Sequence, residues 1–110
     1  MEKMYKMRDI NIIKDEIVAQ LAKVIDPELN IDIVNLGLVY AIDLDEDGIC
    51  LVQMMLTTMG CPLADVLAKM VIKQLKNIPE IKNVDVRFIW EPAWTPDRLS
   101  REAKMILGVH

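Results

Sequence analysis

The segment ICLVQMMLT at residues 49–57 is followed by PLADVLAKMVIKQL at 62–75 and by NVDVRFIW at 83–90, and the order of these three patterns predicts the centre of the fold. The first segment is an apolar run typical of a strand, and the second repeats apolar side chains at helical spacing. The third alternates apolar with polar residues, as a half-buried strand does. A strand, a helix and a strand in this order form a β-α-β crossover, which predicts that the two strands are parallel.

The residues before this unit predict a hairpin and a helix. IVNLGLVYAIDL at 33–44 and the turn DEDG at 45–48 lead directly into 49–57, which indicates an antiparallel hairpin. Residues 12–25 carry apolar side chains at helical spacing, with Asn11 as the expected N-cap. Pro27 then requires the chain to leave the helix.

A closing helix is expected over residues 95–108, with Thr95 as its N-cap and Gly108 as its stop. The predicted order is therefore α-β-β-α-β-α, an α+β fold of the α/β sandwich type. A small, three-stranded mixed sheet carries the helices. The chain has 110 residues, which we interpret as one domain, 1–110.

Charge and hydropathy narrow the possible functions. The chain has 17 acidic and 13 basic residues and a net charge of -4, so it lacks the positive field on which nucleic acid binding depends. Its start, MEKMYKMRD, has no apolar stretch resembling a secretory signal, and no segment approaches the ~20 apolar residues of a membrane span. We expect a cytoplasmic protein that binds neither nucleic acid nor membranes.

The two cysteines, Cys50 and Cys61, are too few for a disulfide framework or a closed zinc site. Cys50 shares a strand face with apolar residues and is expected in the core. Cys61 precedes the predicted helix, where the helix dipole and free amides lower a thiol pKa, and Thr57 and Thr58 could donate hydrogen bonds to its sulfur. A small buried cysteine that closes the turn is the alternative at this position.

Two carboxylates, Asp26 and Glu28, flank Pro27 at the end of the first helix. The sequence by itself favours a turn with solvated charges. A role as metal ligands would require the pair to lie near Cys61, from which both are distant in sequence.

The C-terminal third holds two tryptophans and a basic stripe. Trp90 falls on the apolar face of the strand 83–90 and is expected in the core, whereas Trp94 lies in a loop between two prolines. Trp94 either covers the edge of the core or contacts a partner. Arg98 begins a helical stripe that is either solvated or part of the same partner surface.

Three stretches resemble one known family: VIDPELNIDIVNLGLVYAI, LTTMGCPLADVL and VRFIWEPAWTPDRLSREAKMILG. They are similar to the SufT-like family, the metal-sulfur cluster biosynthesis domain, over essentially the whole chain. The resemblance implies a role in maturing iron-sulfur proteins. It also implies that Cys61 of the T-x-x-x-C-P motif is the functional residue and that Asp26 belongs to the D-P-E motif. Asn35 stands where relatives often have aspartate.

These features lead to one principal hypothesis and two alternatives. An iron-sulfur cluster normally has four thiolates or equivalent ligands, so a labile cluster could be bridged by Cys61 from two chains, each with a further ligand such as Glu28, Asp26 or a small external thiol. The principal hypothesis is therefore a non-enzymatic assembly factor, compatible with a homodimer, that carries or transfers a cluster. The first alternative is an adaptor that joins carrier or scaffold proteins to client apoproteins through Trp94 and Arg98. The second is a thiol-redox protein, which the lack of a C-x-x-C partner disfavours.

Overall fold

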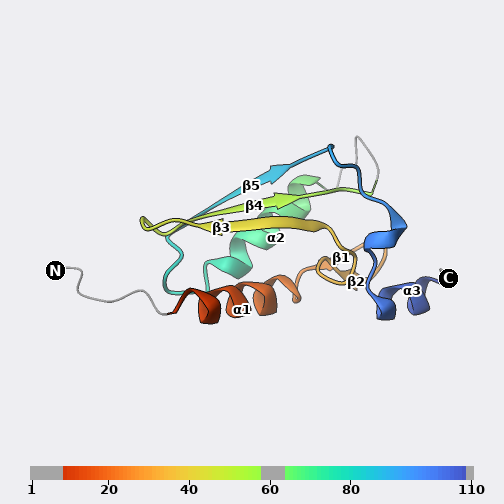
Figure 1. Cartoon of the computed structure of the whole chain (residues 1–110), viewed down its shortest axis with the longest axis horizontal. Coiled ribbons are helices and arrows are strands. Elements are labelled where there is room, and N and C mark those ends of the chain that lie inside the picture. The colour runs from red at the N-terminus through yellow and green to blue at the C-terminus, as the bar shows by residue number, and fades with distance from the viewer. Residues whose placement is uncertain (1–8, 58–63, 109–110) are drawn as a thin grey trace.

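The fold is a sheet with the two long helices on one of its faces (Figure 1). The computed structural model describes residues 9–57 and 64–108. The elements in chain order are α1 (Ile10–Leu21), β1 (Ile25–Asp26), β2 (Ile31–Asp32), β3 (Val39–Leu44), β4 (Ile49–Met54), α2 (Ala64–Leu75), β5 (Asn83–Phe88), the 3-10 helix η1 (Pro96–Arg98) and α3 (Arg101–Leu107). The predicted α+β class and the order of the long elements are confirmed.

The main sheet has three strands in the order β3-β4-β5 within the described residues. β3 pairs with β4 in antiparallel fashion, and β4 pairs with β5 in parallel. Across these strands Val52 is aligned with Ile42 on one side and with Val86 on the other. The mixed sheet and the parallel crossover are as the sequence predicts.

The core lies between the sheet and the two long helices. α2 packs against β5, and α1 packs against α2. Each helix buries one residue per turn on a single stripe, and the central strand β4 buries every second residue. The buried residues of these three elements are Ile13, Ile17 and Leu21 of α1, Leu67, Val71 and Leu75 of α2, and Cys50, Val52 and Met54 of β4. Each buried aliphatic side chain of this size contributes roughly 1.5–3 kcal/mol.

The first helix begins and ends earlier than the sequence predicts. Asp9, rather than Asn11, is the N-cap, because its carboxylate accepts a hydrogen bond from the Asn11 backbone N–H at 2.8 Å. The helix ends at Leu21 because Ile25 and Asp26 pair with the second short strand, Ile31–Asp32. This two-stranded sheet was not predicted.

The predicted strand 33–44 is a strand only from Val39 onward. The preceding residues form tight turns in which the Leu38 backbone N–H donates to the Ile33 carbonyl at 3.0 Å. The Asp32 carboxylate fixes the turn by accepting from the Asn35 backbone N–H at 3.0 Å and from its side-chain amide at 2.6 Å. The sequence did not predict these turns, because the apolar, β-branched composition of residues 33–38 is typical of a strand.

The closing helix is broken into two pieces. Thr95 precedes only the short η1 and makes no capping hydrogen bond with its side chain. The true N-cap of α3 is Ser100, whose hydroxyl accepts from the Ala103 N–H at 3.1 Å. Gly108 ends α3 in the left-handed conformation with φ 73°, as predicted. None of the helices that the structure describes combines the length and the apolar character needed to cross a membrane.

Candidate functional site

Cys50 is a core residue and not a reactive thiol. Its exposed fraction is 0%, and it lies in β4 opposite Leu44 and Val84. Burial, reinforced by the negative charge of Asp43, raises the pKa of the Cys50 thiol from 9.0 to about 11. The sequence-based assignment of Cys50 to the core is confirmed, and the residue is a neutral thiol at physiological pH.

Cys61 and Thr58 lie outside the residues that the structure describes, so their assignment to the site stays a prediction. Thr57, the last described residue before this stretch, is half-buried. The connecting segment runs from the carboxyl end of the central strand β4 to the start of α2. Ligand sites in parallel α/β units typically form at this edge of the sheet.

Asp26 is a buried residue of the turn that joins β1 to β2. Its side chain is 6% exposed, and its Oδ1 accepts from the backbone N–H groups of Glu28 at 2.8 Å and Leu29 at 3.2 Å. Glu28 itself is exposed. Within 9–57 and 64–108 no three His, Cys, Asp or Glu side chains are grouped to hold a metal ion. A ligand role for Asp26 and Glu28 together with Cys61 therefore remains a prediction.

Trp94 anchors the loop after β5 to the turn before β3. Its indole Nε1 donates to the Leu36 carbonyl at 2.8 Å, and its half-buried ring packs against the core. Trp94 was expected either to cover the edge of the core or to contact a partner, and these contacts agree with the first role. Its predicted partner role is untested.

Arg98 holds the same two segments together. Its Nε donates to the Gly37 carbonyl at 2.7 Å, an Nη group donates to the Val39 carbonyl at 3.2 Å, and the guanidinium lies 5.8 Å from the ring centroid of Tyr40. Gly37 has φ 71°, and a Cβ there would overlap the Arg98 backbone. The partner role predicted for Arg98 also stays a prediction.

Trp90 is not in the core, contrary to prediction. The strand ladder of β5 ends at Phe88, so the alternation of buried and exposed residues does not extend to Trp90. Its side chain is 42% exposed. The described part of the loop that follows β5 therefore presents Trp90, more than Trp94, to other molecules.

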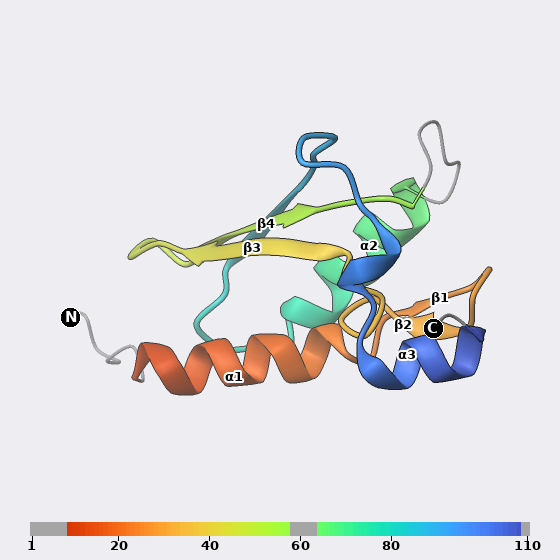
Figure 2. The same ribbon diagram turned by 45° about the vertical axis from the view of Figure 1, so that its right-hand side comes forward.

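A cavity of about 190 Å³ separates the small β1–β2 sheet from α3, which lie side by side (Figure 2). Its lining residues are Ile25, Asn30, Ile31, Asp32, Asn35, Glu102, Ala103 and Ile106. Met105 and Ile106 on α3 are 75% and 69% exposed. Sequence reasoning missed this surface, because α3 was expected to be part of a longer helix.

The fold and the positions of the two cysteines can be compared with those of known protein families. A small α+β domain buries one thiol in its sheet and carries its other cysteine in the connection after the central strand, within the T-x-x-x-C-P motif. The sequence pattern of the family described as iron-sulfur cluster assembly protein matches residues 14–88. The chain belongs to this family.

Individual relatives support the same assignment. The Fe-S protein maturation auxiliary factor YitW of Bacillus subtilis is 50% identical over 97 residues, covering 88% of this chain and 95% of the relative. The Fe-S protein maturation auxiliary factor SufT of Staphylococcus aureus is 54% identical over 86 residues, covering 78% and 98% respectively. A crystal structure of a domain of unknown function from Bacillus anthracis superposes with a TM-score of 0.84 at 42% identity, covering 91% of this chain and 95% of that one.

Proposed function

We propose that this protein is a maturation factor for iron-sulfur proteins and that it holds a labile cluster, as cargo, through Cys61. The observation that carries the proposal is the burial of Cys50. Of the two cysteines in the chain, Cys50 is 0% exposed and has a raised pKa of about 11, so Cys61 is left as the candidate thiolate ligand. Membership of the iron-sulfur cluster assembly family supports the proposal that the cargo is an iron-sulfur cluster. Relatives named as Fe-S protein maturation factors support it as well.

The number of ligands suggests a shared and exchangeable site. A cluster normally needs four thiolates or equivalent ligands, and each chain offers one candidate thiolate, that of Cys61. Two chains could each contribute Cys61 and one further ligand. Glu28 suits this role better than Asp26, because Glu28 is exposed whereas an oxygen of Asp26 already accepts two backbone hydrogen bonds.

Release from such a site is a ligand exchange. Cysteine thiols of the client protein replace the two Cys61 sulfurs and the two further ligands on iron one after another. Each client thiol loses its proton on binding iron, and a released Cys61 thiolate takes up one such proton. No electrons are transferred and no bond of the cluster core breaks. The protein acts in the cytoplasm and performs no catalytic step in this proposal.

The exposure of Trp90 favours a second candidate, an adaptor that brings carriers and clients together. A 42% exposed tryptophan is an unusual surface residue that is often buried at protein interfaces. An adaptor would bind a carrier equally well after Cys61→Ser and would lose binding after Trp90→Ala. Trp94→Ala is a poorer test, because it removes the indole donor that bonds the Leu36 carbonyl.

Anaerobic loading with ferrous iron and sulfide tests the principal proposal. Wild type, Cys61→Ser and the matched control Cys50→Ala are compared by visible absorption and by mass from light scattering. We expect wild type and Cys50→Ala to gain cluster absorption and to shift from monomer to dimer, whereas Cys61→Ser does neither. Equal loading of Cys61→Ser would contradict the proposal. Loading of none of the three proteins would favour the adaptor.

A further inference from the structure

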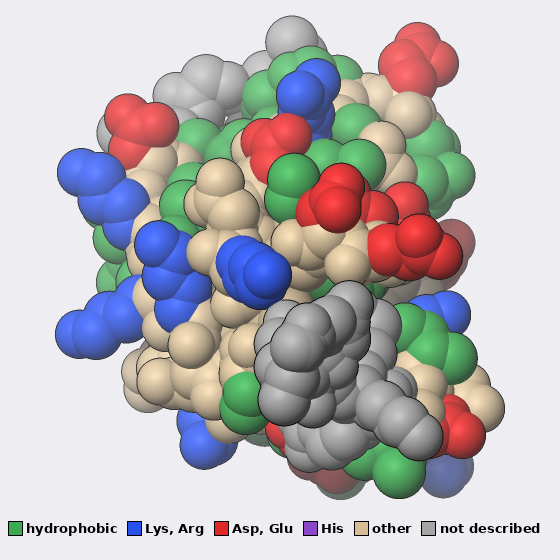
Figure 3. All heavy atoms as spheres, turned by 90° about the vertical axis from the view of Figure 1, so that its left-hand side faces the viewer, with side chains coloured by type: hydrophobic (Ala, Val, Ile, Leu, Met, Phe, Trp, Pro, Cys, Tyr) green, Lys and Arg blue, Asp and Glu red, His purple; other side chains and the backbone are tan. Residues whose placement is uncertain are grey.

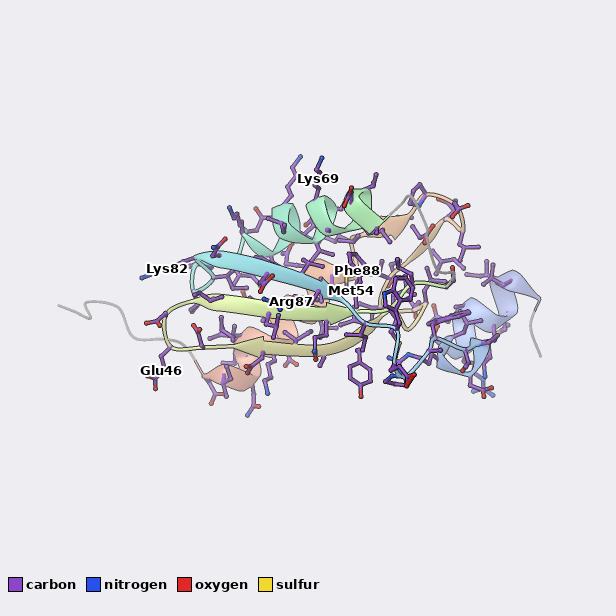
Figure 4. The ribbon with its side chains drawn as sticks, turned by 90° about the horizontal axis from the view of Figure 1, so that it is seen from above. Glu46, Met54, Lys69, Lys82, Arg87 and Phe88 are labelled. Carbon is purple, nitrogen blue, oxygen red and sulfur yellow. The ribbon has the colours of Figure 1, made fainter. Side chains whose placement is uncertain are left out.

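The face of the main sheet that points away from α1 and α2 forms a shallow hollow of about 450 Å³. Figure 4 looks onto this face, with Arg87 near the middle of the sheet. We call it the outer sheet face. Its lining residues are Asp43, Asp45, Ile49, Leu51, Gln53, Asp85 and Arg87. None of them belongs to the segment that holds Cys61.

The outer sheet face has an apolar centre between two acidic edges. In the sheet register Leu51 of the central strand lies between Asp43 on β3 and Asp85 on β5. Ile49, on the same side of β4, is 42% exposed. An apolar centre with a charged rim is the usual composition of a surface that binds another protein.

The charge of this face is negative. Its lining includes three carboxylates and one guanidinium, a formal charge of -2. The Arg87 guanidinium lies 3.1 Å from an Asp85 oxygen, in an exposed ion pair that leaves the β3 side acidic. Figure 3 shows acidic side chains gathered on one side of the end at which β3 turns into β4, with basic side chains on the other. A cationic partner is therefore attracted to the β3 side of the face.

The outer sheet face is open to solvent within the described residues. Sheets made only of parallel strands are normally covered on both faces, whereas this sheet is mixed, with β5 parallel and β3 antiparallel to β4. Both long helices lie on one side, and no described element covers the other (Figure 1). A helix on the open side would give the sheet helices on both faces, the layer arrangement of α/β folds.

We propose that the outer sheet face docks a basic amphipathic helix of a partner protein. Residues two apart on a strand are ~6.7 Å apart, and residues four apart on a helix are ~6.0 Å apart along its axis. An apolar pair at i and i+4 of the helix therefore rests on Ile49 and Leu51. A helix of ~10 Å diameter spans the three strands, which places lysines or arginines of one flank near Asp43 on β3 and the other flank near the Asp85–Arg87 ion pair on β5.

A synthetic helix tests the proposal directly. The probe is a peptide of about 18 residues, roughly five turns, with leucines at i, i+4 spacing and lysines on both flanks. The control peptide has glutamate in place of every lysine. Binding to the full chain is measured by calorimetry at low and at physiological salt, and the contacted residues are mapped by backbone NMR shifts.

Variants separate docking from general attraction. Asp43→Asn with Asp85→Asn removes two charges from the face, and the charge-matched control, Asp15→Asn with Asp97→Asn, removes two exposed carboxylates elsewhere. We expect the first pair to weaken binding roughly three- to tenfold and the control pair to leave it within about twofold. Leu51→Ser should weaken binding to a similar extent, and far-UV circular dichroism verifies that each variant is folded.

Three outcomes would overturn the proposal. The first is equal weakening by both double variants, which indicates non-specific attraction. The second is NMR shifts confined to α3 or to the loop after β5. The third is a doubling of mass without peptide that is lost on Leu51→Ser, which assigns the face to a second copy of the chain. Shifts along β3, β4 and β5 together with the expected weakening support the proposal.

Discussion

Two regions of the molecule obtain their structure in different ways. The β4-α2-β5 unit follows its own hydrophobic pattern, because its helix and central strand bury residues at regular intervals. The 25–38 segment, which includes β1, β2 and the turns before β3, is held by the 94–100 segment through bonds between residues about 60 positions apart in sequence, such as Trp94 to Leu36. Local periodicity therefore defines the β4-α2-β5 unit, whereas contacts between residues distant in sequence define the turns.

The largest effect on stability is expected from substitutions in the core of the β4-α2-β5 unit. Leu67 of α2 is 1% exposed, so Leu67→Ala removes buried apolar volume and should lower the free energy of unfolding by about 3 kcal/mol. The neighbouring Val66 is 44% exposed and provides the control. Val66→Ala should change the stability by less than about 0.5 kcal/mol. Urea denaturation measures both, and equal losses would contradict the assignment of the buried stripe.

Gly37 tests the contact between the 25–38 and 94–100 segments. Gly37→Ala places a Cβ against the Arg98 backbone at φ 71°, and we expect a loss of about 2 kcal/mol. Gly108 has a similar φ of 73° but no atom within 4 Å of the added Cβ. Gly108→Ala should therefore cost about 1 kcal/mol, the conformational part alone. If thermal denaturation gives identical losses for the two, the close packing at Gly37 is not significant.

Arg98 tests the same contact through hydrogen bonds. Arg98→Met keeps the length of the side chain but removes donors to the Gly37 and Val39 carbonyls, and should cost roughly 1–2 kcal/mol. Amide exchange should increase in the 25–38 segment and stay unchanged in β4. Arg101→Met, at an exposed position of α3, is the control and should alter neither. Faster exchange throughout the sheet would show that the two regions are not separable.

Cys50 gives the smallest effect, on the pH dependence of stability. Since folding raises the pKa of this thiol from 9.0 to about 11, the unfolded chain loses the proton first as pH rises. The contribution of Cys50 to stability is fully present below pH ~9 and is lost as the pH rises through ~9 to ~11, with a loss of about 1 kcal/mol at pH ~10. Urea denaturation of wild type and Cys50→Ala from pH 8 upward isolates this contribution. Parallel curves for the two proteins would contradict the burial of the thiol.

The same contrast explains what could be predicted from the sequence. The β-α-β crossover, the hairpin turn and the burial of Cys50 follow from short-range patterns, and all are present in the structure. The turns of the 25–38 segment could not be predicted, because bonds such as Trp94 to Leu36 join residues far apart in the chain. Trp90 was misassigned because the pattern does not show that the ladder ends at Phe88.

The candidate site was predictable to a lesser degree than the fold. The position before a predicted helix and the family resemblance point to Cys61, whose role stays a prediction, and the burial of Cys50 leaves Cys61 as the other thiol. The outer sheet face was not identified, because its acidic residues come from strands whose register only the fold reveals. Asp43 and Asp85 are separated in sequence but lie on either side of Leu51.

Transfer of a cluster to a client protein tests the proposed role of Cys61 as its ligand. Protein loaded with cluster is mixed anaerobically with a cluster-free ferredoxin, and formation of the holo-ferredoxin is followed by circular dichroism. Cys50→Ala should transfer at the wild-type rate, whereas Cys61→Ser, treated identically, should give only the rate of free iron and sulfide. Transfer by Cys61→Ser at the wild-type rate would contradict the claim that the cluster passes through Cys61.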